Sequence, residues 1–164
     1  MKLIFLDIDG VLNSEETKFV FSRTLFNRLG RILAETGAKL IITSGWRGYN
    51  VEDTILNLTN TEDPSVGNNP FPFGPWVVYV TPRSGDTRGG ELNASLICAP
   101  FRCHMEIDTW IIIDDEDFDY DKRQLSHLVK TDPSIGLSDA DVALAIQMLN
   151  EPETIKECLE IQEP

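Results

Sequence analysis

Two pairs of aspartates follow apolar runs that lie far apart in the sequence. Asp7 and Asp9 come after the run KLIFL, and Asp114 and Asp115 come after the run WIII. Carboxylates that lie close together repel one another unless a cation or a proton compensates their charge. Mg²⁺ prefers oxygen ligands, takes few of them from the protein and keeps several waters. The two pairs therefore predict a magnesium site, provided that the fold brings them together.

Hydroxyl groups and arginines can complete a phosphate-binding site beside these carboxylates. A third apolar run, KLII, ends at Thr43-Ser44-Gly45. A hydroxyl and free backbone N–H groups at such a turn can hold a phosphoryl oxygen, and Gly45 lets the backbone approach a ligand closely. The basic residues nearest to these turns are Arg47, Arg83 and Arg88. Because Arg88 precedes a predicted helix start, we expect it to reach the same edge.

The elements that must position these residues alternate between strands and helices. We predict strands at 2–6, 39–42, 76–80, 110–113 and 128–129, and helices at 24–36, 51–59, 89–98 and 139–149. The stretch 60–75, rich in Pro and Gly, predicts a loop. The alternation predicts an α/β fold, a three-layer sandwich around a mainly parallel sheet. Ligands bind beyond the carboxyl ends of the strands in such sheets, which is where the polar residues stand here.

Length and composition limit the class of protein. The chain has 164 residues, about the size of one ordinary domain. With 14 Lys and Arg residues against 27 Asp and Glu residues, its net charge is −13, which argues against a broad basic face that follows a nucleic-acid backbone. No apolar run approaches the ~20 residues of a membrane span, and the apolar N-terminal stretch is too short for a secretory signal. We expect a single domain at residues 1–164, cytoplasmic and without a membrane partner.

Together, these motifs resemble those of the haloacid dehalogenase (HAD) superfamily of phosphotransferases. The first motif is Asp-x-Asp-Gly at Asp7 to Gly10, the second is the apolar strand that ends at Ser44, and the fourth is the apolar strand that ends at Asp115. The resemblance spans about residues 2–149. It implies a Rossmann-like HAD fold.

The third HAD motif normally supplies a lysine ahead of a helix, and this chain departs from that pattern. No lysine lies between Lys39 and Lys122, so Arg88 is the candidate, with Arg83 as the second choice. Arginine keeps the positive charge and adds a planar fork that suits phosphate. More narrowly, segments such as SGWR, RGGEL and WIIIDD are similar to the small HAD domains associated with RNA-repair proteins.

The resemblance implies a role for each motif residue. Asp7 would be the nucleophile that forms an aspartyl-phosphate, and Asp9 would be the general acid and base. The acid role requires a proton that is either held by Asp9 or brought by the substrate, and we expect burial beside other carboxylates to favour the protonated form of Asp9. The Mg²⁺ ligands would be the side chains of Asp7, Asp114 and Asp115 and the carbonyl of Asp9. Ser44 would donate to a phosphoryl oxygen.

The same resemblance places substrate contacts at Thr43, Gly45, Arg47 and Arg83. The connection between Asp9 and Thr43 is too short for an inserted cap domain, so 60–75 is the only candidate lid. An uncovered site admits a phosphorylated small molecule, a nucleotide or the terminal phosphate of a nucleic acid. Trp46 and Phe73 could stack on a base, but we expect both to pack within the protein.

Two other interpretations fit part of the pattern. A receiver-like signalling module accepts phosphate on an aspartate without turnover, but its acceptor should end a central strand, where this chain has Thr43 and Ser44. A degenerate HAD domain would only bind phosphate or partners. The missing lysine favours that interpretation, and the four intact aspartates argue against it. We therefore predict a Mg²⁺-dependent phosphatase that hydrolyses a phosphomonoester.

Overall fold

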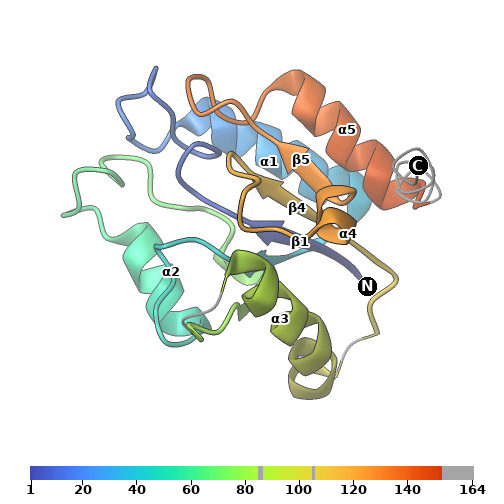
Figure 1. Cartoon of the computed structure of the whole chain (residues 1–164). Helices are drawn as coiled ribbons and strands as arrows, with labels where there is room; N and C mark the ends of the chain where they lie inside the picture. Colours follow the sequence, from blue (N-terminus) through green and yellow to red (C-terminus); the bar gives the residue numbers. More distant parts are fainter. Residues whose placement is uncertain (85–86, 105, 153–164) are drawn as a thin grey trace.

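A parallel sheet forms the centre of the molecule (Figure 1). The computed structural model describes residues 1–84, 87–104 and 106–152. Among these residues, five strands form the sheet: β1 (Lys2–Leu6), β2 (Lys39–Ile42), β3 (Val77–Val80), β4 (Thr109–Asp114) and β5 (Leu128–Lys130). Their order across the sheet is β3-β2-β1-β4-β5, and every neighbouring pair is parallel. The predicted α/β class is confirmed.

Helices cover both faces of this sheet. They are α1 (Arg23–Thr36), α2 (Val51–Thr59), α3 (Arg88–Cys103), α4 (Lys122–Leu125) and α5 (Asp139–Asn150), with a 3₁₀ turn at Gly74–Trp76. α1 and α5 lie on one face and α3 lies on the other (Figure 1). Side chains alternate between the faces of a strand, so Ile4 and Leu6 of β1 pack towards α1 and α5, whereas Leu3 and Phe5 pack towards α3. The three predicted layers are therefore present.

Local signals in the sequence explain where several helices begin and end. Ser138 caps α5, since its side chain accepts a hydrogen bond from Asp141 N while the Asp141 side chain accepts one from Ser138 N. Gly37 ends α1 in the left-handed conformation, with φ at 68°. The Thr87 side chain accepts from Gly90 N at the start of α3, which makes Arg88 the first residue of that helix.

Several predicted bounds shift by one residue in the structure, and three differences have a clear origin. β3 starts at Val77, because Trp76 belongs to the 3₁₀ turn. α3 continues through Pro100 to Cys103, since Ala99 in this last part is fully buried against the sheet and packing outweighs propensity. α4 was too short to leave a periodic pattern. The acidic tail after Pro152 lies outside the described residues.

The β1–β2 connection holds α1 and no cap domain, as predicted. The segment 60–75 is packed onto the body of the protein rather than standing free as a lid. Val66 and Phe71 are buried in the same core cluster as α1, and the Phe73 ring lies 6.2 Å from the ring of Phe26. The predicted packing role of Phe73 is confirmed. Within the described residues, no helix combines the length and the apolar character that crossing a membrane requires.

Candidate active site

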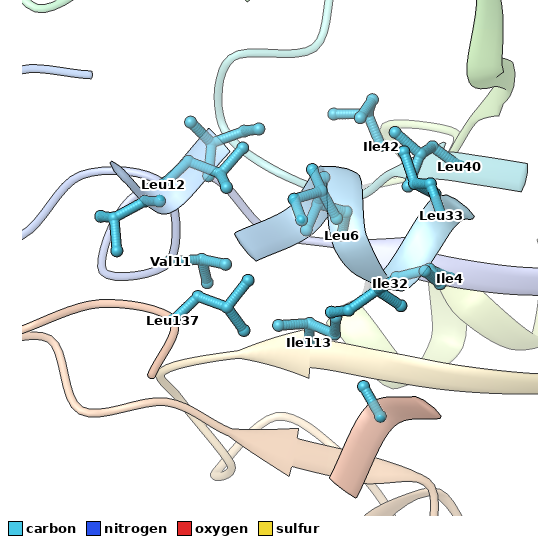
Figure 2. Close-up of a cluster of buried hydrophobic side chains, with 14 of the residues drawn as sticks. Ile4, Leu6, Val11, Leu12, Ile32, Leu33, Leu40, Ile42, Ile113 and Leu137 are labelled. Atoms are coloured by element: carbon cyan, nitrogen blue, oxygen red, sulfur yellow. The ribbon is translucent and has the colours of Figure 1, made fainter. Parts of the chain in front are cut away.

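Hydrogen bonds continue one residue beyond β1 and bring three strand ends together. Asp7 N donates to Ile113 O at 3.0 Å, and Thr43 N donates to Leu6 O at 3.0 Å. Because β1 lies between β2 and β4, Asp7 stands between the hydroxyl turn after β2 and the two aspartates at the end of β4. Leu6, Ile42 and Ile113 pack in one buried cluster directly before these polar residues (Figure 2). The apolar core thus fixes the backbone that carries the site.

Three carboxylates converge at this edge of the sheet. One side-chain oxygen from each of Asp7, Asp114 and Asp115 lies within 4.8 Å of the others. Asp7 is 2% exposed and Asp114 is 0% exposed, while Asp115 is half-buried. Asp7 Oδ1 is buried and accepts no hydrogen bond from the part of the chain that the structure describes. A buried oxygen without a partner carries a desolvation cost, and a ligand that binds it removes that cost.

Gly10 permits the close approach of Asp115 to the loop after β1. Gly10 has a φ of +71°, and a Cβ added there would lie 2.5 Å from Asp115 Cγ. A hydrogen bond from Thr131, the residue after β5, also holds this loop, because Thr131 Oγ1 donates to Gly10 O at 2.9 Å. The glycine of the first motif is therefore required by both backbone conformation and space.

Arg88 is the cation among these carboxylates. Its Nη1 forms an ion pair with Asp114 Oδ2 and lies 3.5 Å from Asp7 Oδ1. Burial lowers the pKa of Arg88, but the charges of Asp7 and Asp114 outweigh it and raise the pKa above its usual value. Arg83 lies at the turn after β2 instead, where its Nη2 donates to Gly45 O at 3.0 Å. Of the two arginines proposed for the third motif, the structure brings Arg88 to the carboxylates.

Asp114 has both of its oxygens engaged within the protein. Tyr120 Oη donates to Oδ2 at 2.7 Å, and Glu116 N donates to Oδ1 at 2.9 Å. Burial and the charge of Asp114 raise the pKa of Tyr120 above its usual value, so its hydroxyl remains a donor at neutral pH. Together with Arg88, these donors hold the Asp114 side chain in one orientation.

Burial makes the other two carboxylates hard to ionise. Burial and the charge of Asp114 raise the pKa of Asp7 to about 7, although Arg88 and a hydrogen bond from Ser44 oppose the change. The same two causes, burial and Asp114, raise the pKa of Asp115 to about 6. Burial is the larger cause of both shifts, and a cation bound at this edge would offset it.

The carboxylate group fits a hard divalent cation such as Mg²⁺. It offers only oxygen ligands, and one of them, Asp7 Oδ1, accepts no hydrogen bond from the described residues. The raised pKa values of Asp7 and Asp115 would fall beside a cation. Since the oxygens of Asp114 are already engaged, Asp7 and Asp115 are better placed to hold the ion. A contribution from the Asp9 carbonyl stays a prediction.

The hydroxyl turn after β2 lies against Asp7. Ser44 is buried, and its side chain forms a hydrogen bond with Asp7. Thr43 is buried as well, and within the described residues its Oγ1 has no hydrogen-bond partner. The geometry therefore favours Ser44 over Thr43 as the hydroxyl beside the nucleophile candidate.

Asp9 does not have the buried environment that we predict from the sequence. It is exposed to solvent. Trp46 Nε1 lies 3.1 Å and 3.0 Å from its two oxygens, and Asn13 Nδ2 donates to Oδ1 at 2.7 Å. The expectation that burial favours the protonated form of Asp9 is wrong, because the loop turns this carboxylate outwards. Two neutral donors hold it there instead.

A hollow of about 450 Å³ opens beside Asp9, and we call it the substrate hollow. Gly45, Arg47 and Arg83, three of the predicted substrate contacts, border it. Arg47 contributes little charge to this space, because its Nη2 pairs with Glu91 at 2.7 Å and its Nη1 donates to Thr43 O at 2.9 Å. The geometry of Arg47 thus indicates a brace between segments rather than a substrate contact.

Sequence reasoning missed four residues that shape this site. Asn13, Tyr120 and Glu91 had no predicted role, although Asn13 follows the first motif and Glu91 lies in the segment RGGEL, since each gains its role from a partner that is brought close only by the fold. Trp46 was predicted to pack within the protein, and its ring does lie 5.1 Å from that of Phe21. Its indole N–H on Asp9 is the additional role.

A comparison with protein-family models matches residues 3–142 to the HAD domain found in Swiss Army Knife RNA repair proteins. Comparisons with curated proteins and with solved structures find no match. The matched segment contains all four motifs, from the first aspartates to the end of β4, and most of the elements that carry them. By the family match and by its fold, the chain belongs to the HAD domains of Swiss Army Knife RNA repair proteins.

Proposed function

We propose that this protein is a Mg²⁺-dependent phosphatase that hydrolyses phosphomonoesters through an aspartyl-phosphate on Asp7. The observation that carries the proposal is the convergence of Asp7, Asp114 and Asp115 on one another, with Asp7 Oδ1 buried and without a hydrogen bond from the described residues. HAD membership supports phosphatase activity in general. The metal, the intermediate and the substrate are the parts that the proposal adds.

Each residue of the site has one task in the reaction. An Asp7 oxygen attacks phosphorus, and the bond from phosphorus to the leaving oxygen breaks as Asp9 passes to that oxygen the proton that the phosphate monoanion brings. A water then attacks the phosphorus of the aspartyl-phosphate, Asp9 takes its proton, and inorganic phosphate and free Asp7 result. When bound, Mg²⁺ supplies the positive charge that keeps Asp7 ionised beside a phosphate dianion.

Ser44 and Arg88 prepare the site for the transferred phosphoryl group. Both are fixed before substrate arrives, Ser44 by its hydrogen bond with Asp7 and Arg88 by its ion pair with Asp114. Donors that are already oriented stabilise developing charge without reorganisation. For this reason we assign to Ser44 and Arg88 the role of hydrogen-bond donors to the phosphoryl oxygens.

We further propose that the phosphate belongs to a nucleotide or to the end of a nucleic acid. The chain has no cap between β1 and β2, the substrate hollow is open beside Asp9, and the matched family acts in RNA repair by its description. The net charge of −13 disfavours long contacts along a phosphate backbone, so we expect recognition of a strand end. A terminal phosphate needs only a local site.

The test is hydrolysis of phenyl phosphate with Mg²⁺ or with EDTA, by wild type and Asp7→Asn. We expect activity that requires the metal and falls at least about 1,000-fold in the variant, since the nucleophile is lost. The matched control is Asp139→Asn, which changes an aspartate in a surface ion pair with Arg28, and we expect it to keep wild-type activity. Stable phosphorylation without turnover would instead support the receiver-like interpretation. An absence of both turnover and metal binding would support the degenerate one.

A further inference from the structure

A second hollow, of about 520 Å³, opens at the carboxyl end of β3. Its lining includes Tyr79 of β3, Thr81 just after β3, Tyr49 just before α2, Val51 at the start of α2 and Arg102 of α3. We call it the tyrosine hollow. Its volume lies within the range of small-molecule sites, roughly 300–1,000 Å³. Nothing in the phosphatase mechanism uses it.

Arg83 connects the tyrosine hollow to the substrate hollow. It borders both of them, and its Nη2 donates to Gly45 O at 3.0 Å and to Arg47 O at 2.5 Å. These two carbonyls belong to the turn that follows Ser44, so the guanidinium is held at the boundary. Arg83 is therefore the residue shared by the hollow beside Asp9 and the tyrosine hollow.

The two tyrosines present aromatic surface of the kind that binds bases. Tyr49 is 97% exposed, so its ring adds little to the stability of the fold and is free to stack on a ligand. Tyr79 is half-buried against the apolar side chains on the α3 face of the sheet and pairs with Ile41 of β2, which fixes its position at the hollow. Stacking on tyrosine is a general means of binding unpaired bases.

The charge of the tyrosine hollow also favours a nucleotide. Among the described residues that border it, Arg83 and Arg102 stand against one acid, Glu52, although the whole chain carries a net charge of −13. Arginine both attracts phosphate and stacks on bases. With the terminal phosphate of a substrate at Asp7, these arginines are left for stacking on a base and, at a strand end, for the next phosphate of the strand.

We propose that the tyrosine hollow binds the nucleoside attached to the phosphate that is hydrolysed, with the base stacked on Tyr49 and Tyr79. This inference rests on the proposed phosphatase function for the position of that phosphate. Arg83 and Arg102 then face the ribose-phosphate chain. The ligand is a nucleoside with a terminal phosphate, either free or at the end of a strand.

The first test compares kcat/KM for adenosine monophosphate, with its phosphate at the 3′ or the 5′ position, to kcat/KM for phenyl phosphate. For Tyr49→Ala we expect the nucleotide-to-phenyl ratio to fall about 10-fold to 100-fold, from the loss of one base stack. The matched control is Tyr49→Phe, which keeps the ring and should change the ratio less than about twofold. An unchanged ratio in Tyr49→Ala, or an equal fall in both variants, would overturn the proposal.

The second test separates this inference from the phosphatase proposal. It measures binding of adenosine monophosphate by calorimetry to Asp7→Asn, with and without the added Tyr49→Ala change. Weaker binding of adenosine monophosphate to the double variant supports a nucleoside site at the tyrosine hollow, even if the wild-type protein hydrolyses nothing. Equal binding by the single and double variants contradicts that site, even if the wild-type protein is an active phosphatase. Binding of a phosphorylated trinucleotide is measured in parallel. If the ligand is a strand end, the trinucleotide binds more tightly than the mononucleotide, and if the ligand is a free nucleotide, it does not.

Discussion

At the scale of single residues, Asp9 is held by side chains whose contact with it the motifs do not predict. Its carboxylate is exposed, with Trp46 Nε1 on both oxygens and Asn13 on one. Asn13 also accepts from Gly10 N at 3.0 Å, so it ties Asp9 to the motif loop. An acid that must reach a leaving oxygen benefits from such fixed orientation. We therefore treat Trp46 as a positioning residue for Asp9.

Replacing Trp46 with phenylalanine should separate positioning from packing. Trp46→Phe keeps a ring against Phe21 and removes the N–H that binds Asp9. General acid catalysis contributes about 100-fold or more when the leaving group is poor. We expect turnover of phenyl phosphate to fall about 10-fold and turnover of 2,4-dinitrophenyl phosphate, which needs little protonation, to change much less.

The control for this variant is Trp76→Phe. Trp76 lies in the 3₁₀ turn, where its ring packs against Phe73 and under Lys39. For Trp76→Phe we expect the ratio of the turnover rates on phenyl phosphate and 2,4-dinitrophenyl phosphate to equal that of the wild-type protein. Equal losses on both substrates in Trp46→Phe would contradict a positioning role and indicate general damage to the site.

At the scale of elements, a buried ion pair joins the turn after β2 to α3. Arg47 Nη2 lies 2.7 Å from Glu91 Oε2, and both side chains are nearly buried. Arg47 also donates to Thr43 O and to Thr81 Oγ1, at the ends of β2 and β3. Because Ser44 follows β2 and Arg88 begins α3, this pair fixes the two elements that supply the phosphoryl-binding groups.

Breaking one side of this pair should cost more than replacing both sides. Glu91→Gln leaves the Arg47 charge buried without its partner, and we expect a loss of about 3 kcal/mol in the free energy of unfolding. The double change Arg47→Met with Glu91→Leu removes both charges at similar volume, and we expect it to recover most of that loss. Urea denaturation measures both. The surface pair of Arg31 and Glu35 is the control, and Glu35→Gln should cost less than about 1 kcal/mol. A double variant as unstable as Glu91→Gln would contradict this account.

At the scale of the whole molecule, the parallel sheet concentrates negative charge at one edge. Every strand points the same way, so acids that follow β1 and β4 meet although more than a hundred residues separate them. Burial and Asp114 raise the pKa of Asp7 to about 7 and that of Asp115 to about 6. Without a metal, these groups favour the folded state only while they are protonated.

The metal-free protein should therefore lose stability as the pH rises from about 4 to about 7. The folded pKa of Asp7 is above its ordinary value of 3.8, so its stabilising effect is complete below pH 4 and is lost as the pH passes 7. The loss is on the order of 4 kcal/mol for Asp7 alone. Because protons compete with the metal, Mg²⁺ should raise the melting temperature more at pH 8 than at pH 5.

Thermal melting with EDTA or Mg²⁺ at these two pH values measures the effect. Asp7→Asn removes the titrating group and serves as the control, because the general repulsion of a chain with a net charge of −13 remains. We expect this variant to show a smaller loss of stability between pH 5 and pH 8 in EDTA. A Mg²⁺ effect of the same size at both pH values would contradict proton competition at these carboxylates.

The elements and the aspartates could be predicted because both depend on local and directional features. Apolar runs such as KLIFL and WIII can be buried only as central strands, and parallel strands share one carboxyl edge. That was enough to place Asp7, Asp114 and Asp115 together. The choice of Arg88 also followed from its place at the start of α3.

Other properties depended on which side chains meet in space, and these only the folded chain decides. Asp9 accepts from Trp46, which is 37 positions away, and Arg47 is engaged by Glu91, 44 positions away. Strand order and direction follow from the pattern of burial along one segment, whereas the partner of a polar side chain depends on the packing of several segments at once. For this reason the carboxylates of the site were visible in the sequence, and the exposure of Asp9 and the brace at Arg47 were not.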